Sequence, residues 1–231
     1  MNASIDPAVR AAFDRLIDYA GLFPPATLSL EEAVAEYAAE RRGAAAWMLG
    51  RFIVPASRLD AIAQTWESRH QAAALPLSVI VDAAGDPRRW FASLQQVLAA
   101  VARARNDLPQ VHVEALEIPL PPPASARETF DAPVGQLGAA LDRAGVRDLP
   151  AYVELPQHER SAELLEGAMR ALARARLNAK LRCGGVVADA FPPVAGVAAF
   201  IAAAAADGVA FKATAGLHHP VRHRDAATGF T

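Results

Sequence analysis

Cysteine, excess charge and long apolar runs are all scarce in this sequence. The one cysteine among 231 residues, Cys183, excludes an internal disulfide and fits a reducing compartment. A formal net charge of -2 at pH 7 argues against nucleic-acid binding, because no basic excess exists to neutralise phosphates. The most apolar helical segment, 194–208, is too short and too alanine-rich to cross a bilayer, and the N-terminus has no signal-peptide core. We therefore expect a cytoplasmic protein that binds neither nucleic acid nor membranes.

Strand-like and helix-like segments alternate along the whole sequence. Hydrophobic residues make up 53% and charged residues 21%, which is typical of a globular domain with a large core. Apolar runs predict strands at 19–24, 47–54, 76–82, 111–118, 150–155, 178–183 and 209–214. Capped periodic segments between them predict helices at 29–43, 57–71, 86–106, 134–145, 161–176 and 192–208. This alternation predicts one α/β domain over residues 1–231 with a parallel sheet and right-handed crossovers.

Two architectures fit such alternation, an open doubly wound sheet and a (β/α)₈ TIM-type barrel. A dinucleotide-binding sheet should carry a glycine-rich turn after its first strand, whereas segment 21–29 reads GLFPPATLS. Charged residues instead recur near the carboxyl ends of the strands, where a barrel builds its site. They are Arg51, Asp82, Glu117, Glu154, Lys180, Arg182 and Lys212. The barrel is favoured, and because only seven strands are found we expect it to be incomplete, with a C-terminal tail beyond Thr231 supplying strand eight.

Two lysines lie on neighbouring strands of this predicted barrel. Alternation places Lys180 opposite Leu181 and Lys212 opposite Phe211, so both amines are expected to point into the lumen. Adjacent parallel strands are about 4.8 Å apart, and a nearby cation with partial desolvation lowers the pKa of an amine. A neutral amine can attack a carbonyl and form a Schiff base. We therefore expect one of the two lysines to be partly neutral near pH 7.

The motifs around these lysines resemble class I aldolases of the deoxyribose-phosphate aldolase type. That family carries a sixth-strand motif close to K-T-S-T-G and a seventh-strand motif close to K-A-S-G-G-I-R-T; here 180–185 reads KLRCGG and 212–219 reads KATAGLHH. The resemblance covers about residues 178–219 and implies Lys180 as the Schiff-base nucleophile and Lys212 as its activator. The family's fourth-strand aspartate has Glu117 as its nearest counterpart here, with Glu114 second.

Other residues complete the predicted site. Arg182, beside Gly184 and Gly185, could hold a carboxylate or phosphate together with backbone N–H groups. Glu154 and Glu117 each end a strand before or near a proline and are candidates for general acid or base. Arg51 and Asp18 could also reach the mouth, Arg51 as a substrate contact.

Histidines near the C-terminus invite a metal hypothesis, but adjacent histidines rarely ligate one ion together. The three are His218, His219 and His223. We expect no metal and no cofactor, with His218 contacting substrate, and we expect Cys183 to be a buried, inert thiol.

The sequence thus predicts a lysine-dependent, aldolase-like carbon–carbon lyase acting on a small, anionic carbonyl compound, within a chain that could form a homo-oligomer. Two alternatives stay open. One is a barrel enzyme that, like the enolases, uses a lysine as general acid or base beside a divalent metal ion, with Asp82, Glu117 and Glu154 as the metal ligands. The other is a non-catalytic barrel whose cationic mouth binds an anion.

Overall fold

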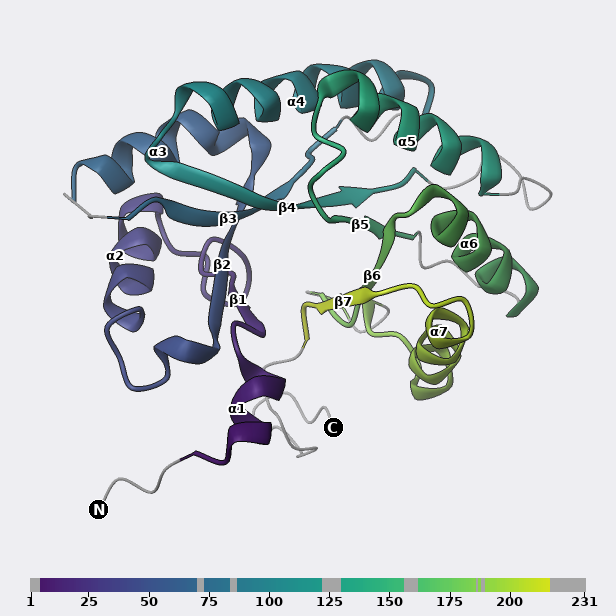
Figure 1. Ribbon diagram of the computed structural model, residues 1–231, viewed down its shortest axis with the longest axis horizontal. Coiled ribbons are helices and arrows are strands. Elements are labelled where there is room, and N and C mark those ends of the chain that lie inside the picture. The colour runs from purple at the N-terminus through teal and green to yellow at the C-terminus, as the bar shows by residue number, and fades with distance from the viewer. Residues whose placement is uncertain are drawn as a thin grey trace.

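Seven parallel strands form one sheet in the order β1-β2-β3-β4-β5-β6-β7, and the sheet curls into an open barrel (Figure 1). The computed structural model describes residues 5–69, 73–83, 87–121, 130–155, 162–185, 187 and 190–216. The strands are β1 (Ile17–Tyr19), β2 (Leu49–Pro55), β3 (Leu75–Ile80), β4 (Val111–Pro119), β5 (Ala151–Glu154), β6 (Asn178–Arg182) and β7 (Phe211–Thr214). The predicted incomplete (β/α) barrel is confirmed.

All of the described helices except the first cover the outer face of this sheet, and the first lies apart from it, next to β1 (Figure 1). They are α1 (Pro7–Phe13), α2 (Leu30–Glu40), α3 (Leu59–Glu67), α4 (Pro87–Asp107), α5 (Asp131–Ala144), α6 (Ala162–Ala175) and α7 (Val194–Ala206), with short 3₁₀ turns at Ala46–Met48 and Ala56–Arg58. Ser29 and Glu32 form the capping box that starts α2, and Gly145 ends α5 in the left-handed conformation at φ 68°. None of the described helices is long and apolar enough to cross a membrane.

The start of the chain differs from the sequence-based expectation. The apolar run 19–24 was expected to be the first strand, but β1 covers the more polar Ile17–Tyr19. Beyond Tyr19 the backbone turns, with the Phe23 amide donating to the Ala20 carbonyl and Leu28 to Gly21. Helix α1 was not predicted either, although Asp6 caps it and Pro7 occupies its first turn.

Exposed apolar side chains gather at the two ends of the open sheet. Among the described residues, the large hydrophobic side chains that remain exposed all fall within 5–17 or 187–211. These segments carry the edge strands β1 and β7, and Figure 1 shows the sheet open between those strands.

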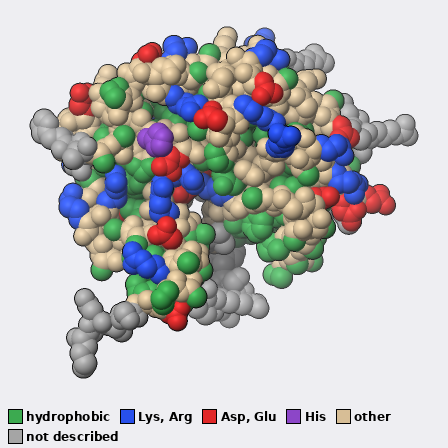
Figure 2. All heavy atoms as spheres, viewed as in Figure 1, with side chains coloured by type: hydrophobic (Ala, Val, Ile, Leu, Met, Phe, Trp, Pro, Cys, Tyr) green, Lys and Arg blue, Asp and Glu red, His purple; other side chains and the backbone are tan. Residues whose placement is uncertain are grey.

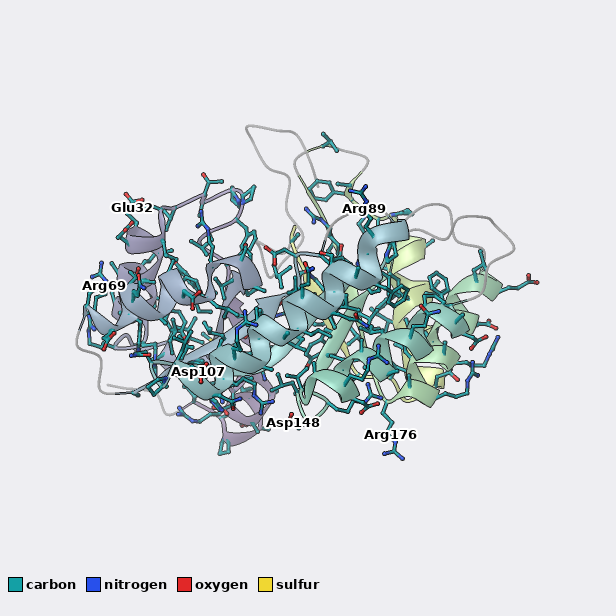
Figure 3. The ribbon with its side chains drawn as sticks, turned by 90° about the horizontal axis from the view of Figure 1, so that it is seen from above. Glu32, Arg69, Arg89, Asp107, Asp148 and Arg176 are labelled. Atoms are coloured by element: carbon teal, nitrogen blue, oxygen red, sulfur yellow. The ribbon has the colours of Figure 1, made fainter. Side chains whose placement is uncertain are left out.

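The two ends of the barrel can be told apart from the loops. Asp107, Asp148 and Arg176 precede β4, β5 and β6, and Figure 3 shows them along one edge of the molecule. Arg89 follows β3 and lies at the opposite edge (Figure 3). We call the first edge the N-terminal face and the second, where the strands end, the mouth.

Candidate active site

The two lysines stand side by side in the lumen. Lys180 of β6 is the register partner of Lys212 of β7. Ala179 and Leu181, the neighbours of Lys180 on β6, are buried in the core, so alternation turns Lys180 inward, and Lys212 points the same way because both lysines contact Glu117. The sequence contains no other lysine, because the remaining 21 of its 23 basic residues are arginine. The scarcity of lysine was the strongest sequence signal that Lys180 and Lys212 have a special role. The comparison of motifs did not use it.

Three carboxylates surround the two ammonium groups. Lys180 Nζ lies 2.7 Å from Glu117 Oε2 and 2.9 Å from Glu154 Oε2. Lys212 Nζ lies 2.6 Å from Asp18 Oδ2 and 2.7 Å from Glu117 Oε1. Glu117 therefore bridges the lysines, and acidic groups outnumber ammonium groups in what we call the lysine cluster.

Glu117 is the centre of this cluster. Its side chain is 1% exposed, and Ser78 Oγ, which is itself buried, donates to its Oε1 over 2.7 Å. Burial alone would raise the pKa of Glu117, but Lys180 and Lys212 outweigh it and lower the pKa to about 2. The carboxylate is thus held ionised.

The expected neutral lysine is not the resting state. Burial lowers the pKa of Lys180, but Glu117 and Glu154 more than offset this and hold the pKa above its ordinary value. The predicted lowering of the pKa rested on the repulsion between two ammonium groups and left out the carboxylate between them. Lys180 is therefore protonated at rest and must lose its proton before it can act as a nucleophile.

The two lysines differ in the carboxylates beside them. Glu154, which contacts Lys180, is the last residue of β5 and is 21% exposed. Lys212 is instead held by Asp18, Glu117 and the Ser78 hydroxyl, the last at 3.3 Å. The most exposed carboxylate of the cluster therefore lies beside Lys180.

A bulge in β4 separates the two candidate glutamates along the barrel axis. Leu77 pairs with Val113 and Ser78 with Ala115, so Glu114 is skipped in the register. Glu117 joins the lysine cluster, whereas Glu114 binds Arg15 at 2.6 Å and so belongs to the N-terminal side.

Asp18 is a member of the cluster whose role the sequence left open. One oxygen accepts from the Arg51 backbone amide at 2.6 Å while the other faces Lys212. Gly50 makes room for it, because a Cβ at Gly50 would lie 2.4 Å from Asp18 Oδ1. The Arg51 guanidinium is occupied by carboxylates, with Nε 3.2 Å from Glu114 and a terminal nitrogen 3.8 Å from Asp18.

The loops after β6 and β7 meet closely at the mouth. Arg182 is exposed, and its Nε donates to the Gly184 carbonyl at 2.9 Å. A Cβ on Gly184 would lie 2.8 Å from the Gly216 Cα, and a Cβ on Gly185 would lie 2.6 Å from the Ala190 Cβ, so both glycines permit close backbone approach. His218, like His219 and His223, lies outside the described residues.

The remaining candidates do not join the lysine cluster. Cys183 is half-buried just after β6, and burial raises the pKa of its thiol, which suits an unreactive group. Asp82 accepts from the Ser57 hydroxyl and backbone amide. Within the described part of the chain, no three His, Cys, Asp or Glu side chains gather in a way that could hold a metal ion.

Comparison with known proteins finds similarity in fold. No family model matches the chain, and no curated protein matches it. A deoxyribose phosphate aldolase from Aeropyrum pernix, described as having a unique tetrameric structure, superposes with a TM-score of 0.54 at 13% identity, covering 91% of this chain and 79% of that one. An Escherichia coli 3-keto-D-glucoside 4-epimerase matches with a TM-score of 0.43 at 12% identity, over 92% of this chain and 94% of that one. The first of these superpositions shows a shared (β/α)-barrel fold.

Proposed function

We propose that this protein is an aldolase-like lyase, in which Lys180 forms a Schiff base with a small, anionic carbonyl compound. The observation that carries the proposal is the placement of the chain's only two lysines. Arginine serves at every other basic position, yet β6 and β7 hold lysines in register and buried, 8% and 13% exposed. An ion pair alone could use arginine, whereas reversible loss of a proton and attack on a carbonyl require an amine.

The first step is transfer of a proton from Lys180 to Glu154. The two groups are 2.9 Å apart, and Glu154 is the most exposed carboxylate of the cluster. Lys212 stays paired with Asp18 and Glu117. Its positive charge favours the neutral form of Lys180 once Glu154 has been neutralised.

The neutral Lys180 amine then attacks the carbonyl carbon, forming a C–N bond while the carbonyl electron pair takes up a proton from Glu154. One proton of the attached nitrogen then moves to that hydroxyl, which leaves as water, and the product is a protonated imine. The imine accepts the electron pair of the carbon–carbon bond that breaks, and the hydroxyl proton of the leaving aldehyde passes through a water to Glu117 or Glu154. Arg182 is proposed to hold the anionic group of the substrate at the mouth.

Reductive trapping tests this function with little background, because residues 1–231 contain no lysine besides Lys180 and Lys212. We expect a panel of short oxo acids and sugar phosphates with borohydride to add mass at Lys180, located by mass spectrometry of fragments. Lys180→Arg should abolish the adduct. Lys212→Leu should slow labelling by about tenfold or more, since one unit of pKa changes the neutral fraction tenfold. Lys212→Arg keeps a cation and should slow labelling less.

Two results would count against the proposal. Labelling of Lys180 no faster than that of the N-terminal amine, across the whole panel, leaves an anion-binding barrel without Schiff-base chemistry. Labelling at Lys212 instead would reverse the assigned roles. The metal-assisted alternative has less support, because the Lys180 ammonium lies between Glu117 and Glu154, where a cation would have to bind.

A further inference from the structure

A cavity lies at the N-terminal face, at the opposite end of the barrel from the mouth. Its volume is about 530 Å³, within the range of small-molecule sites. Its walls come from the beginnings of strands, including Leu49 of β2, Pro76 of β3 and His112 of β4. Figure 2 views the molecule as Figure 1 does and shows basic and acidic side chains gathered around the histidine on this face.

Arginines outnumber carboxylates around this cavity. Arg10, Arg15 and Arg41 line it, together with Asp14 and Glu114. Arg10 lies over the Trp47 ring at 5.1 Å, and Arg41 lies over the Tyr37 ring at 5.9 Å. Neither of these two has a carboxylate partner among the described residues, whereas Arg15 binds Glu114 at 2.6 Å.

We propose that this cavity binds a small polyanion, such as a phosphorylated compound. Guanidinium groups that rest on aromatic faces keep their N–H donors available at the ring edge, and arginine suits the bidentate geometry of phosphate oxygens. Arg15 and Arg51 already neutralise Glu114, so Asp14 is the one remaining carboxylate in the lining to set against Arg10 and Arg41. The proposal does not rest on the Schiff-base reaction.

Ion pairs connect this cavity with the lysine cluster. Arg15 binds Glu114; Glu114 lies 3.2 Å from Arg51; Arg51 contacts Asp18, which binds Lys212 at 2.6 Å. An anion that recruits Arg15 leaves Glu114 to Arg51 alone. Arg51 is then drawn toward Glu114 and away from Asp18. The distance between the Arg51 guanidinium and the Asp18 carboxylate is already long, at 3.8 Å. Binding at the cavity therefore changes the charge that faces Lys212.

Calorimetric titration of the full chain with inorganic pyrophosphate at low ionic strength tests the site. Wild type should bind, and Arg10→Gln and Arg41→Gln should each weaken binding by about tenfold, a change readily resolved as a shift in Kd. Arg42→Gln removes the neighbouring exposed arginine, which does not line the cavity, and should bind as wild type does. Arg10 is on an exposed helix, so its variant tests the site even if Arg41→Gln fails to fold.

Three outcomes overturn the site. Wild type could fail to bind pyrophosphate at millimolar concentration. Arg42→Gln could lose as much affinity as Arg41→Gln, which would indicate diffuse charge attraction. Arg182→Gln could abolish binding while Arg10→Gln and Arg41→Gln keep it, which would place the anion at the mouth.

The connection has its own test, because coupling between two sites is reciprocal. Asp18→Asn, or Lys212→Met should the first variant fold poorly, should change the pyrophosphate Kd by about fivefold or more. Unchanged affinity in a folded variant of either kind would show that the cavity acts alone.

Discussion

Replacing Glu117 by glutamine removes the one charge that contacts both lysines. The isosteric amide keeps an oxygen for Ser78 or a lysine but loses the negative charge 2.7 Å from each ammonium. Both ammonium groups are largely buried, so the variant leaves positive charge in the lumen without its main partner. Removing one partner of a buried pair costs about 3–5 kcal/mol, and we expect Glu117→Gln to lose that much stability at pH 7.

The pH dependence of stability gives a second value for the free energy that Glu117 contributes to folding. The pKa of Glu117 is lowered to about 2, below its value in an unfolded chain. The stability it supplies is therefore complete above the unfolded pKa and is lost as the pH falls toward about 2. At 1.36 kcal/mol per unit of pKa, this contribution is about 3 kcal/mol. The difference between wild type and Glu117→Gln should thus shrink steadily between about pH 5 and pH 2.

At the alkaline end the sign is opposite. The pKa of Lys180 is raised, so its contribution is complete below the unfolded pKa of lysine and is lost as the pH rises through the folded value. In Glu117→Gln the Lys180 amine loses its nearer carboxylate. Its deprotonation should then move to lower pH, and reductive labelling should begin at lower pH than in wild type.

Urea unfolding followed by tryptophan fluorescence measures the stabilities, since Trp66 and Trp90 are both buried in the core. Glu154→Gln is the matched control, because Glu154 contacts only Lys180 among the two lysines and is partly exposed. It should cost about 1–2 kcal/mol, near the lower range for a hydrogen bond to a charged group. The reasoning is refuted if Glu117→Gln costs no more than this control, or if its deficit persists unchanged at pH 3.

Two further predictions concern the supports of the site and the open sheet. Gly50→Ala places a methyl group against Asp18, so we expect a loss of about 1–3 kcal/mol in urea unfolding together with slower labelling of Lys180, and an unperturbed variant would contradict the close contact. The exposed apolar side chains on and beside β7, which include Ile201 and Phe211, should make the chain self-associate at high concentration. Light scattering should then give a smaller mass for Ile201→Glu than for wild type, and an unchanged mass would place any contact elsewhere.

The sequence predicted the barrel well because its strands are apolar and regularly spaced. Lys180 and Lys212 could be placed in the lumen by simple alternation, since β6 and β7 pair without a register shift. The predicted position of the first strand is wrong because Asp18 interrupts the short apolar run of β1, and the turn that follows is more apolar than the strand itself. The turn residues Gly21 and Pro24 indicated otherwise.

Irregular pairing explains what the sequence could not predict. Alternation places Glu114 and Glu117 on opposite faces of β4, yet Glu114 reaches Arg51 and Glu117 reaches Lys212, which belong to one connected set of ion pairs. The bulge at Glu114 interrupts the alternation between the two glutamates. The register also shifts between β1 and β2, where Asp18 meets the Arg51 amide. Such shifts depend on contacts between strands distant in sequence, which no local pattern encodes. The protonated state of Lys180 followed from those contacts and was therefore predicted with the wrong sign.

The excess of carboxylates in the lysine cluster makes the protonated resting state compatible with amine chemistry. With Asp18, Glu117 and Glu154 around two ammonium groups, the proton of Lys180 has an acceptor already in contact with it. Transfer to Glu154 converts an ion pair into a neutral acid and a neutral amine. Excluding water from the mouth disfavours charged groups, so a substrate that covers Glu154 shifts this pair toward its neutral form. Glu117, already buried, would not respond in this way, and so in the proposed reaction the partly exposed Glu154 would be the group through which substrate binding activates Lys180.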